Sequence, residues 1–444
     1  MVTTNIGRIF LEAYNRKYET SYSPKAFFDE VYHPIFFNHP KYLMYINNSP
    51  FDQLRKQDSK FKRNLVADES VRLKHKDDFH KKAQIKILDG SFALGYQAAE
   101  IDATTSGQVS NISYKFNSDD VYYSWLGASL GIGMEGGLSV LFDKPEILLY
   151  LFDGWKLYRE FLNKRDLEIQ EYKINSWNGQ YLHLRLSRKQ EPSFLDFARK
   201  NILKPKKESI SFDTVKWTRL FFDLSKAYPT DVWTGYIYSF GRTNTTIGFI
   251  QFHFIAAKKL SEFYCKLFGE NAAIQDACTY EELYGQHIMR ACEQGIISEM
   301  ALCPASLIKI MKENKNISFS AKKHEKDLIT YRTYKTWLLA MITKNNKEML
   351  EATMRLATIL NEFRNKDNKE DNLSRKNRNI IKSLFEATNK NKFINSLIDI
   401  LSEIEEKDKS FILEFRDWIH FMNYDEFIYT KTLLKFDYTF IEQN

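Results

Sequence analysis

Several residue types that define whole classes of protein are scarce in this sequence. Its 444 residues include only 4 cysteines, 9 prolines and 17 glycines. Such low proline and glycine contents exclude a collagen-like or low-complexity chain, and the 43% of hydrophobic residues predict a globular fold with a sizeable core. The four cysteines are widely spaced and form no C-x-x-C pair, so we expect reduced core thiols at Cys265, Cys278, Cys292 and Cys303.

Metal ligands and long apolar runs are also missing. A zinc site that combined His287 with some of the cysteines would match the usual ligand spacing poorly, so we predict neither a metal nor a cofactor. No apolar run reaches the roughly 18 residues of a membrane span, and the N-terminus lacks the pattern of a secretory leader. We therefore expect a cytoplasmic protein with no membrane partner.

Aromatic and basic residues, by contrast, are plentiful. Aromatics make up 15% of the chain, and the net charge of +7 is modest for the length, so the distribution of cations matters more than their sum. Basic side chains gather in four stretches, at residues 55–86, 188–207, 322–335 and 375–392. Each stretch is either a solvated surface or a surface that faces the phosphates of a nucleic acid.

A glycine-rich segment followed by a helical pattern organises the middle of the sequence. Glycine at such density indicates bends or close backbone approach in the segment, at Gly127, Gly131, Gly133, Gly136 and Gly137. The pattern after it predicts a core helix with Asp143 as N-cap and Glu146 three residues on. Its apolar face repeats at helical spacing and comprises Ile147, Leu151, Trp155, Tyr158 and Leu162.

Strand patterns surround this segment. Short extended runs occur between residues 84 and 142, including residues 121–126. Asn178-Gly179 lies between two further runs and predicts a hairpin. A second hairpin is predicted to pair residues 232–240 with 245–255 across the turn at residues 241–244.

Helical patterns replace strand patterns after about residue 256. We predict helices at residues 260–268, 281–300, 304–311, 327–343, 347–363, 378–387, 393–404, 411–421 and 427–434. The sequence therefore indicates an α+β protein with two domains. A mixed α/β domain with antiparallel hairpins would cover residues 1–255, and an all-helical bundle would cover residues 256–444.

Two short motifs raise the question of an enzyme. Residues 131–136 fit G-x-G-x-x-G, but the βαβ unit and the distant acid that a dinucleotide fold requires do not follow. Residues 127–131 fit G-x-S-x-G, the elbow that presents a serine nucleophile, here Ser129. A downstream acid with His183, His253 or His287 would complete a triad, but no alternating β/α series surrounds the motif.

The layout of the chain and two local segments resemble a known family. The segments are GIGMEGGLSVLFDKPEILLYLFDGW and INSWNGQYLHLRLS, and a mixed domain precedes a basic helical bundle. Together they resemble the large subunit of type I CRISPR effector (Cascade) complexes, in a short version related to subtypes A and B. The C-x-x-C pairs of some relatives are absent, which leaves the subtype open.

The resemblance implies a non-catalytic role in a crRNA-guided surveillance complex. Such subunits recognise the short motif that flanks a target in double-stranded DNA, help to start unwinding, and hold a DNA strand on the C-terminal bundle. They also recruit a helicase-nuclease. The implied partners are crRNA, the other subunits of the complex, the target DNA and that helicase-nuclease.

Candidate contact residues follow from side-chain chemistry. Uncharged amides and hydroxyls can read base edges, although the same residues often cap turns. For reading the flanking motif we select Gln108, Ser110 and Asn111, with Arg242 and Asn244 in reserve. For binding the DNA backbone we select Lys322, Lys323, Lys326, Arg375, Lys376, Arg378 and Lys382. A serine hydrolase and a stand-alone DNA-binding protein remain the alternatives.

Overall fold

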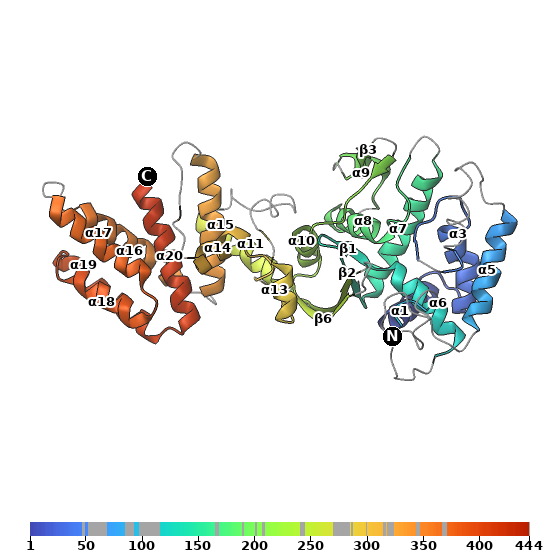
Figure 1. Cartoon of the computed structure of the whole chain (residues 1–444), viewed down its shortest axis with the longest axis horizontal. Helices are drawn as coiled ribbons and strands as arrows, with labels where there is room; N and C mark the ends of the chain where they lie inside the picture. The colour runs from blue at the N-terminus through green and yellow to red at the C-terminus, as the bar shows by residue number, and fades with distance from the viewer. Residues whose placement is uncertain are drawn as a thin grey trace. The chain divides into compact units, whose positions relative to one another are not determined.

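The computed structural model describes most of the chain. The described residues are 1–46, 49–51, 69–84, 93–96, 116–164, 168–188, 191–199, 202–206, 209–239, 245–269, 285, 287–298, 300–313, 317, 324–342, 347–365 and 371–443. They form two compact units (Figure 1). The N-terminal unit comprises Met1–His253 with Gln294–Ile296, and the C-terminal unit comprises Phe254–Glu293 with Ile297–Asn444. Helices dominate and one five-stranded sheet is present, which confirms the predicted α+β class.

The N-terminal unit combines helices with most of a small sheet, whose first four strands in sheet order pair antiparallel. The sheet has the order β1-β2-β5-β6-β7, from Ile132–Met134, Leu138–Phe142, Val232–Ser239, Thr245–His253 and Ile296–Ile297. A separate pair joins β3 and β4, at Lys204–Lys206 and Ser209–Ser211. The helices are α1 (Val2–Lys17), α2 (Pro24–Phe27), α3 (His33–Phe36), α5 (Glu69–Ala83), α6 (Ser118–Ser129), α7 (Pro145–Asn163), α8 (Ile174–Arg188), α9 (Phe194–Arg199) and α10 (Trp217–Ala227), and a π-helical turn, η1, spans Phe28–Tyr32.

The central helix and the second hairpin are confirmed. Helix α7 buries the whole predicted apolar face, although Lys144 and not Asp143 occupies the N-cap position and no side chain caps the helix. Strands β5 and β6 pair antiparallel, as predicted, and the structure places Tyr236 opposite Phe249. Residues 241–244, the predicted turn between them, lie outside the described residues.

The hairpin predicted at Asn178-Gly179 is wrong, because these residues lie inside helix α8. Asn178 is fully buried, and its side-chain amide donates to the carbonyl oxygens of Ser129 and Gly131 at 2.8 and 2.9 Å. Gly179 lies against β1, since a Cβ atom there would be 2.6 Å from the carbonyl oxygen of Gly133. Tertiary packing therefore uses both residues for burial and close approach, and not for a turn.

Two further predictions are wrong for local reasons. Residues 121–126 lie in helix α6, which starts with a capping box in which Asn117 and Asp120 bond to each other's backbone N–H groups. Among the described residues of the helix predicted at 281–300, only Ile288–Glu293 are helical (α13), and Gly295 at φ +69° leads into β7; residues 281–284, 286 and 299 lie outside the described residues.

The C-terminal unit is a helical array. It consists of α11 (Ile255–Phe268), α13, α14 (Ala305–Glu313), α15 (His324–Ile342), α16 (Lys347–Asn365), α17 (Asp371–Glu386), α18 (Lys390–Leu401), α19 (Glu406–Phe421) and α20 (Tyr424–Gln443). Every other helix predicted after residue 256 is confirmed. Helices α16–α20 surround one apolar core, which includes Leu356, Leu360, Phe393, Phe415 and Leu434 (Figure 1).

Glycine permits a very close contact between helices α1 and α6 of the N-terminal unit. A Cβ atom on Gly127 would lie 1.8 Å from the carbonyl oxygen of Thr3, and one on Gly7 would lie 2.0 Å from that of Tyr123. Both obstacles are backbone atoms, which cannot rotate away. The two helices can therefore cross at this distance only with glycine at both positions.

We predict that Gly127→Ala destabilises the N-terminal unit by about 3 kcal/mol or more, because the helices must separate to admit one methyl group. Thermal and denaturant unfolding of the full chain measure this loss. Glu12→Ala, at an exposed position of α1, serves as the control and should change stability by less than about 0.5 kcal/mol. Equal stability of the two variants would contradict the proposed contact.

Candidate nucleic-acid interface

The structure describes some of the predicted contact residues and not others. All five residues selected for motif reading, and Lys322 and Lys323, lie outside the described residues. Lys326 lies in α15, but its side chain is not described. The remaining four cations selected for backbone binding are all exposed on α17: Arg375, Lys376, Arg378 and Lys382.

Helix α17 is strongly amphipathic. Its inner side places Ile381, Leu384 and Phe385 in the core shared by α16–α20. On its outer side Arg375, Arg378 and Lys382 are three and four residues apart, which puts them on one face of the helix. We call these three residues the cation row.

The charges of the cation row are poorly neutralised. Within the described part of the chain, neither Arg375 nor Arg378 has an acidic group within 4.0 Å. Lys382 lies 3.8 Å from Glu386 on the same helix, and both side chains are largely exposed. Exposed pairs of this kind contribute only a few tenths of a kcal/mol, so the row keeps most of its positive potential.

A depression lies beside the cation row, between α17 and α18. Its volume is about 390 Å³, and its walls come from Arg375, Lys376, Asn379, Ile380, Ser383 and Asp399. Lys376 Nζ donates to Glu403 Oε1 at 2.6 Å, and this bond raises the pKa of Lys376. The depression therefore mixes donors, acceptors and one half-buried apolar side chain, unlike the cation row.

Sequence reasoning missed four residues of this depression, Asn379, Ile380, Ser383 and Asp399. The spacing of Asn379 and Ser383 places them one helical turn apart, which the sequence could have shown. Asp399 comes from the next helix, and its position depends on how α18 packs against α17.

Ser129 does not form a nucleophile elbow. It is the last residue of α6 and precedes β1, whereas the elbow requires a strand before the serine and a helix after it. The side chain is fully buried, and its hydroxyl donates to the Trp125 carbonyl at 2.9 Å and lies 2.6 Å from the Tyr32 hydroxyl. Burial and these bonds keep the hydroxyl away from any substrate.

The three histidines considered as partners of Ser129 lie on separate elements. His183 belongs to α8, where its Nδ1 is 2.5 Å from Asp223 Oδ2 of α10; both side chains are buried, and burial raises the pKa of Asp223. His253 ends β6 and contacts Gln251. His287 precedes α13. The described hydrogen bonds connect none of these imidazoles to Ser129.

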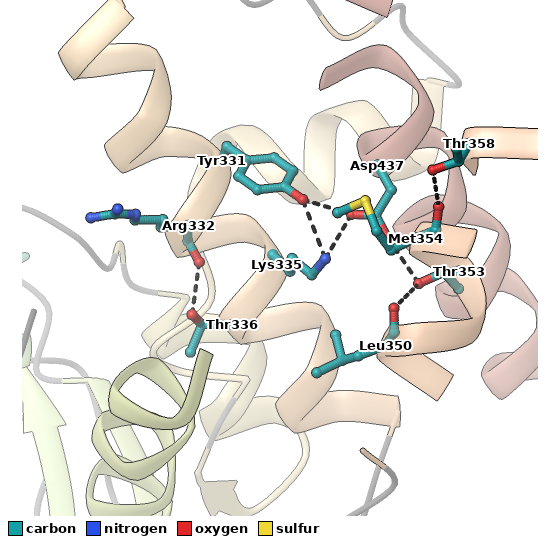
Figure 2. Close-up of polar contacts among 9 residues, drawn as sticks. All are labelled: Tyr331, Arg332, Lys335, Thr336, Leu350, Thr353, Met354, Thr358 and Asp437. Atoms are coloured by element: carbon teal, nitrogen blue, oxygen red, sulfur yellow. Dashed lines mark hydrogen bonds and ion pairs between the residues drawn. The ribbon is translucent and has the colours of Figure 1, made fainter. Parts of the chain in front are cut away.

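The C-terminal unit contains a buried polar network centred on Asp437 of α20 (Figure 2). Tyr331 and Lys335 of α15 donate to Asp437 Oδ1 at 2.8 and 2.9 Å, and Thr353 of α16 donates to Oδ2 at 2.9 Å. Lys335 also donates to the Tyr331 hydroxyl at 3.2 Å. The network joins three helices, and its charges are paired and hydrogen-bonded, which is the condition for burying them.

Groups that could hold a metal ion are missing from the described residues: nowhere do three His, Cys, Asp or Glu side chains gather for this purpose. Cys292 and Cys303 are buried free thiols, and burial raises the pKa of Cys292 to about 11 and that of Cys303 further. Within the described ranges, every helix is too short or too polar to cross a membrane.

Comparison with known proteins gave no match to any family model, curated protein or solved structure.

We predict that Asp437→Asn destabilises the C-terminal unit by about 3–5 kcal/mol, because the Lys335 ammonium group would remain buried without its counter-charge. Denaturant unfolding of the full chain measures the change. Lys409→Ala, which breaks the exposed pair with Glu406 on α19, should cost at most about 1 kcal/mol. If both variants lose the same stability, the network does not hold the helices together.

Proposed function

We propose that this chain is the non-catalytic large subunit of a crRNA-guided type I CRISPR surveillance complex, of the short version related to subtypes A and B. In this role it recognises the target-flanking motif in double-stranded DNA, aids unwinding and R-loop stabilisation, and recruits a helicase-nuclease. Two lines of argument support the proposal: the family resemblance of the sequence, and the cation row on α17.

The cation row is the observation that carries the proposal. Arg375, Arg378 and Lys382 repel one another at spacings of three and four residues, and like charges at this spacing destabilise a helix slightly. None of them belongs to the apolar core, and the exposed pair of Lys382 with Glu386 contributes only a few tenths of a kcal/mol. A phosphate backbone, whose negative charges follow one another at short intervals, is the partner that such a row attracts.

The alternatives differ in how well the geometry suits them. A hydrolase based on Ser129 is disfavoured, because that hydroxyl is buried at the end of a helix. A stand-alone DNA-binding protein could use the same cation row, and only its behaviour without partners would distinguish it from a complex subunit.

The first test is co-expression with the neighbouring genes and purification through this chain. A subunit of a surveillance complex should co-purify with RNA and several other proteins, and the assembly should bind only target DNA that carries the correct flanking motif. A chain that purifies alone and binds a fixed duplex site would contradict the assignment.

The second test measures how salt affects binding of the full chain to a DNA strand. Replacing Arg375, Arg378 and Lys382 with Ala should weaken binding to every sequence and reduce the slope of log K against log salt by about 2, at ~0.7 per lost phosphate contact. The matched control replaces Lys407, Lys409 and Arg416 of α19, three exposed cations that are each paired with an acid. An unchanged slope in the α17 variant would show that its cations do not contact phosphates.

A further inference from the structure

The depression between α17 and α18 differs from the cation row in one respect: it contains a free acceptor. Asp399 is exposed on α18, and no described side chain forms an ion pair or a hydrogen bond with its carboxylate. Two cations line the depression with it. Lys376 attracts Asp399 but bonds to Glu403, and Arg375 belongs to the cation row. Both carboxylate oxygens of Asp399 are therefore available to a ligand.

Phosphate does not suit this depression. A phosphate beside Asp399 would place two negative charges together, and like charges placed next to each other are costly in recognition. Glu403 already neutralises Lys376, and Arg375, the other cation in the wall, belongs to the cation row, so a phosphate would lie at Arg375 and the row and not beside Asp399. The cation row on the adjacent face of α17 offers phosphate a better position.

A nucleobase does suit the depression. Ile380 offers an apolar surface for a ring face, Asn379 and Ser383 offer hydrogen-bond donors, and Asp399 offers acceptors. The depression has a volume of about 390 Å³ and is open to solvent, since five of its six lining residues are exposed. Base recognition in single strands combines such surface contact with hydrogen bonds to the base edge.

Among the bases, guanine matches a carboxylate best. Its Watson–Crick edge carries two adjacent N–H donors, one on the ring and one on the exocyclic amine, and a carboxylate can accept from both at once. Adenine and cytosine offer only the exocyclic amine at this edge, and thymine offers only a ring N–H. In a duplex this edge is occupied by the paired base, so the guanine must be unpaired.

We propose that the depression between α17 and α18 binds an unpaired guanine base of a strand whose phosphates lie along the cation row. This inference rests on the proposed function, because the strand must first be held by Arg375, Arg378 and Lys382. The affinity of the C-terminal bundle for a strand would then depend on sequence, because strands with a guanine at the depression bind more tightly.

The test compares oligonucleotides by fluorescence anisotropy with the full chain. One is an oligothymidylate, and the others carry isolated guanines or isolated adenines at the same positions. The guanine form should bind about tenfold more tightly than the other two, which is within the range for one bidentate base contact. The same oligonucleotides are also made as RNA. Comparison of the DNA and RNA forms shows whether the guanine belongs to a DNA strand or to the guide RNA. A guanine preference with either form supports the site.

Asp399→Asn tests the role of the carboxylate, because the amide has the same size but can accept only one of the two N–H groups. The variant should lose the guanine preference and keep its affinity for oligothymidylate. Asp417→Asn, the same change at an exposed position of α19, should keep both properties. Circular dichroism checks that each variant retains its helices.

Three results would overturn the inference. They are equal affinity for the guanine and adenine forms, a guanine preference retained by Asp399→Asn, and tighter binding of that variant to every strand, which would mean that Asp399 only repels phosphate. Each of these leaves the proposed function standing, because strands still bind. Failure of the wild-type chain to bind any strand would instead overturn the strand-holding role itself.

Discussion

Close approach of main chains, permitted by glycine, is the constraint on which the N-terminal unit depends. Gly7 and Gly127 bring α1 and α6 together until backbone carbonyl groups occupy the space that a methyl group would need. Because α6 leads directly into β1, this contact also sets where the sheet begins. Gly133 and Gly179 repeat the arrangement between β1 and α8. The aromatic side chains then pack around elements whose spacing the backbone has already determined.

Buried polar side chains complete this framework by bonding to carbonyl groups that helix and sheet leave unpaired. Asn178 bonds to two carbonyls at the end of α6. Arg159 of α7 donates to the carbonyls of Ile35, Phe36 and Lys41, at and after the short helix α3, and burial lowers its pKa to about 10. Such bonds matter because an unpaired carbonyl in the interior costs about as much as a lost hydrogen bond. They hold irregular chain segments that apolar contacts alone would not order.

Patterns contained within one element were readable from the sequence, and contacts between elements were not. The apolar spacing of α7 predicts its helix because every residue of the face belongs to one segment. The turn preference of Asn178-Gly179 is equally local, but burial of Asn178 against α6 overrides it. A local sequence pattern cannot predict that contact. Asp437 illustrates the same limit: its partners Lys335 and Thr353 lie on two other helices. At the candidate site, the cations of α17 were identifiable because basic residues gather in one stretch of sequence, residues 375–392. Asp399 became part of the site only through the packing of α18.

The cation row differs from an ordinary solvated helix face in how its charges are arranged. On α19 and just before it, exposed cations have acids beside them, as in Lys407 with Glu405, Lys409 with Glu406 and Arg416 with Asp417. That arrangement keeps a surface soluble at no electrostatic cost. Among the described side chains, the row on α17 has three cations and one acid within 4.0 Å of them, Glu386, so its charges repel one another. Local departures of this kind are expected where a surface serves a function, because the partner and not the fold supplies the compensating charge.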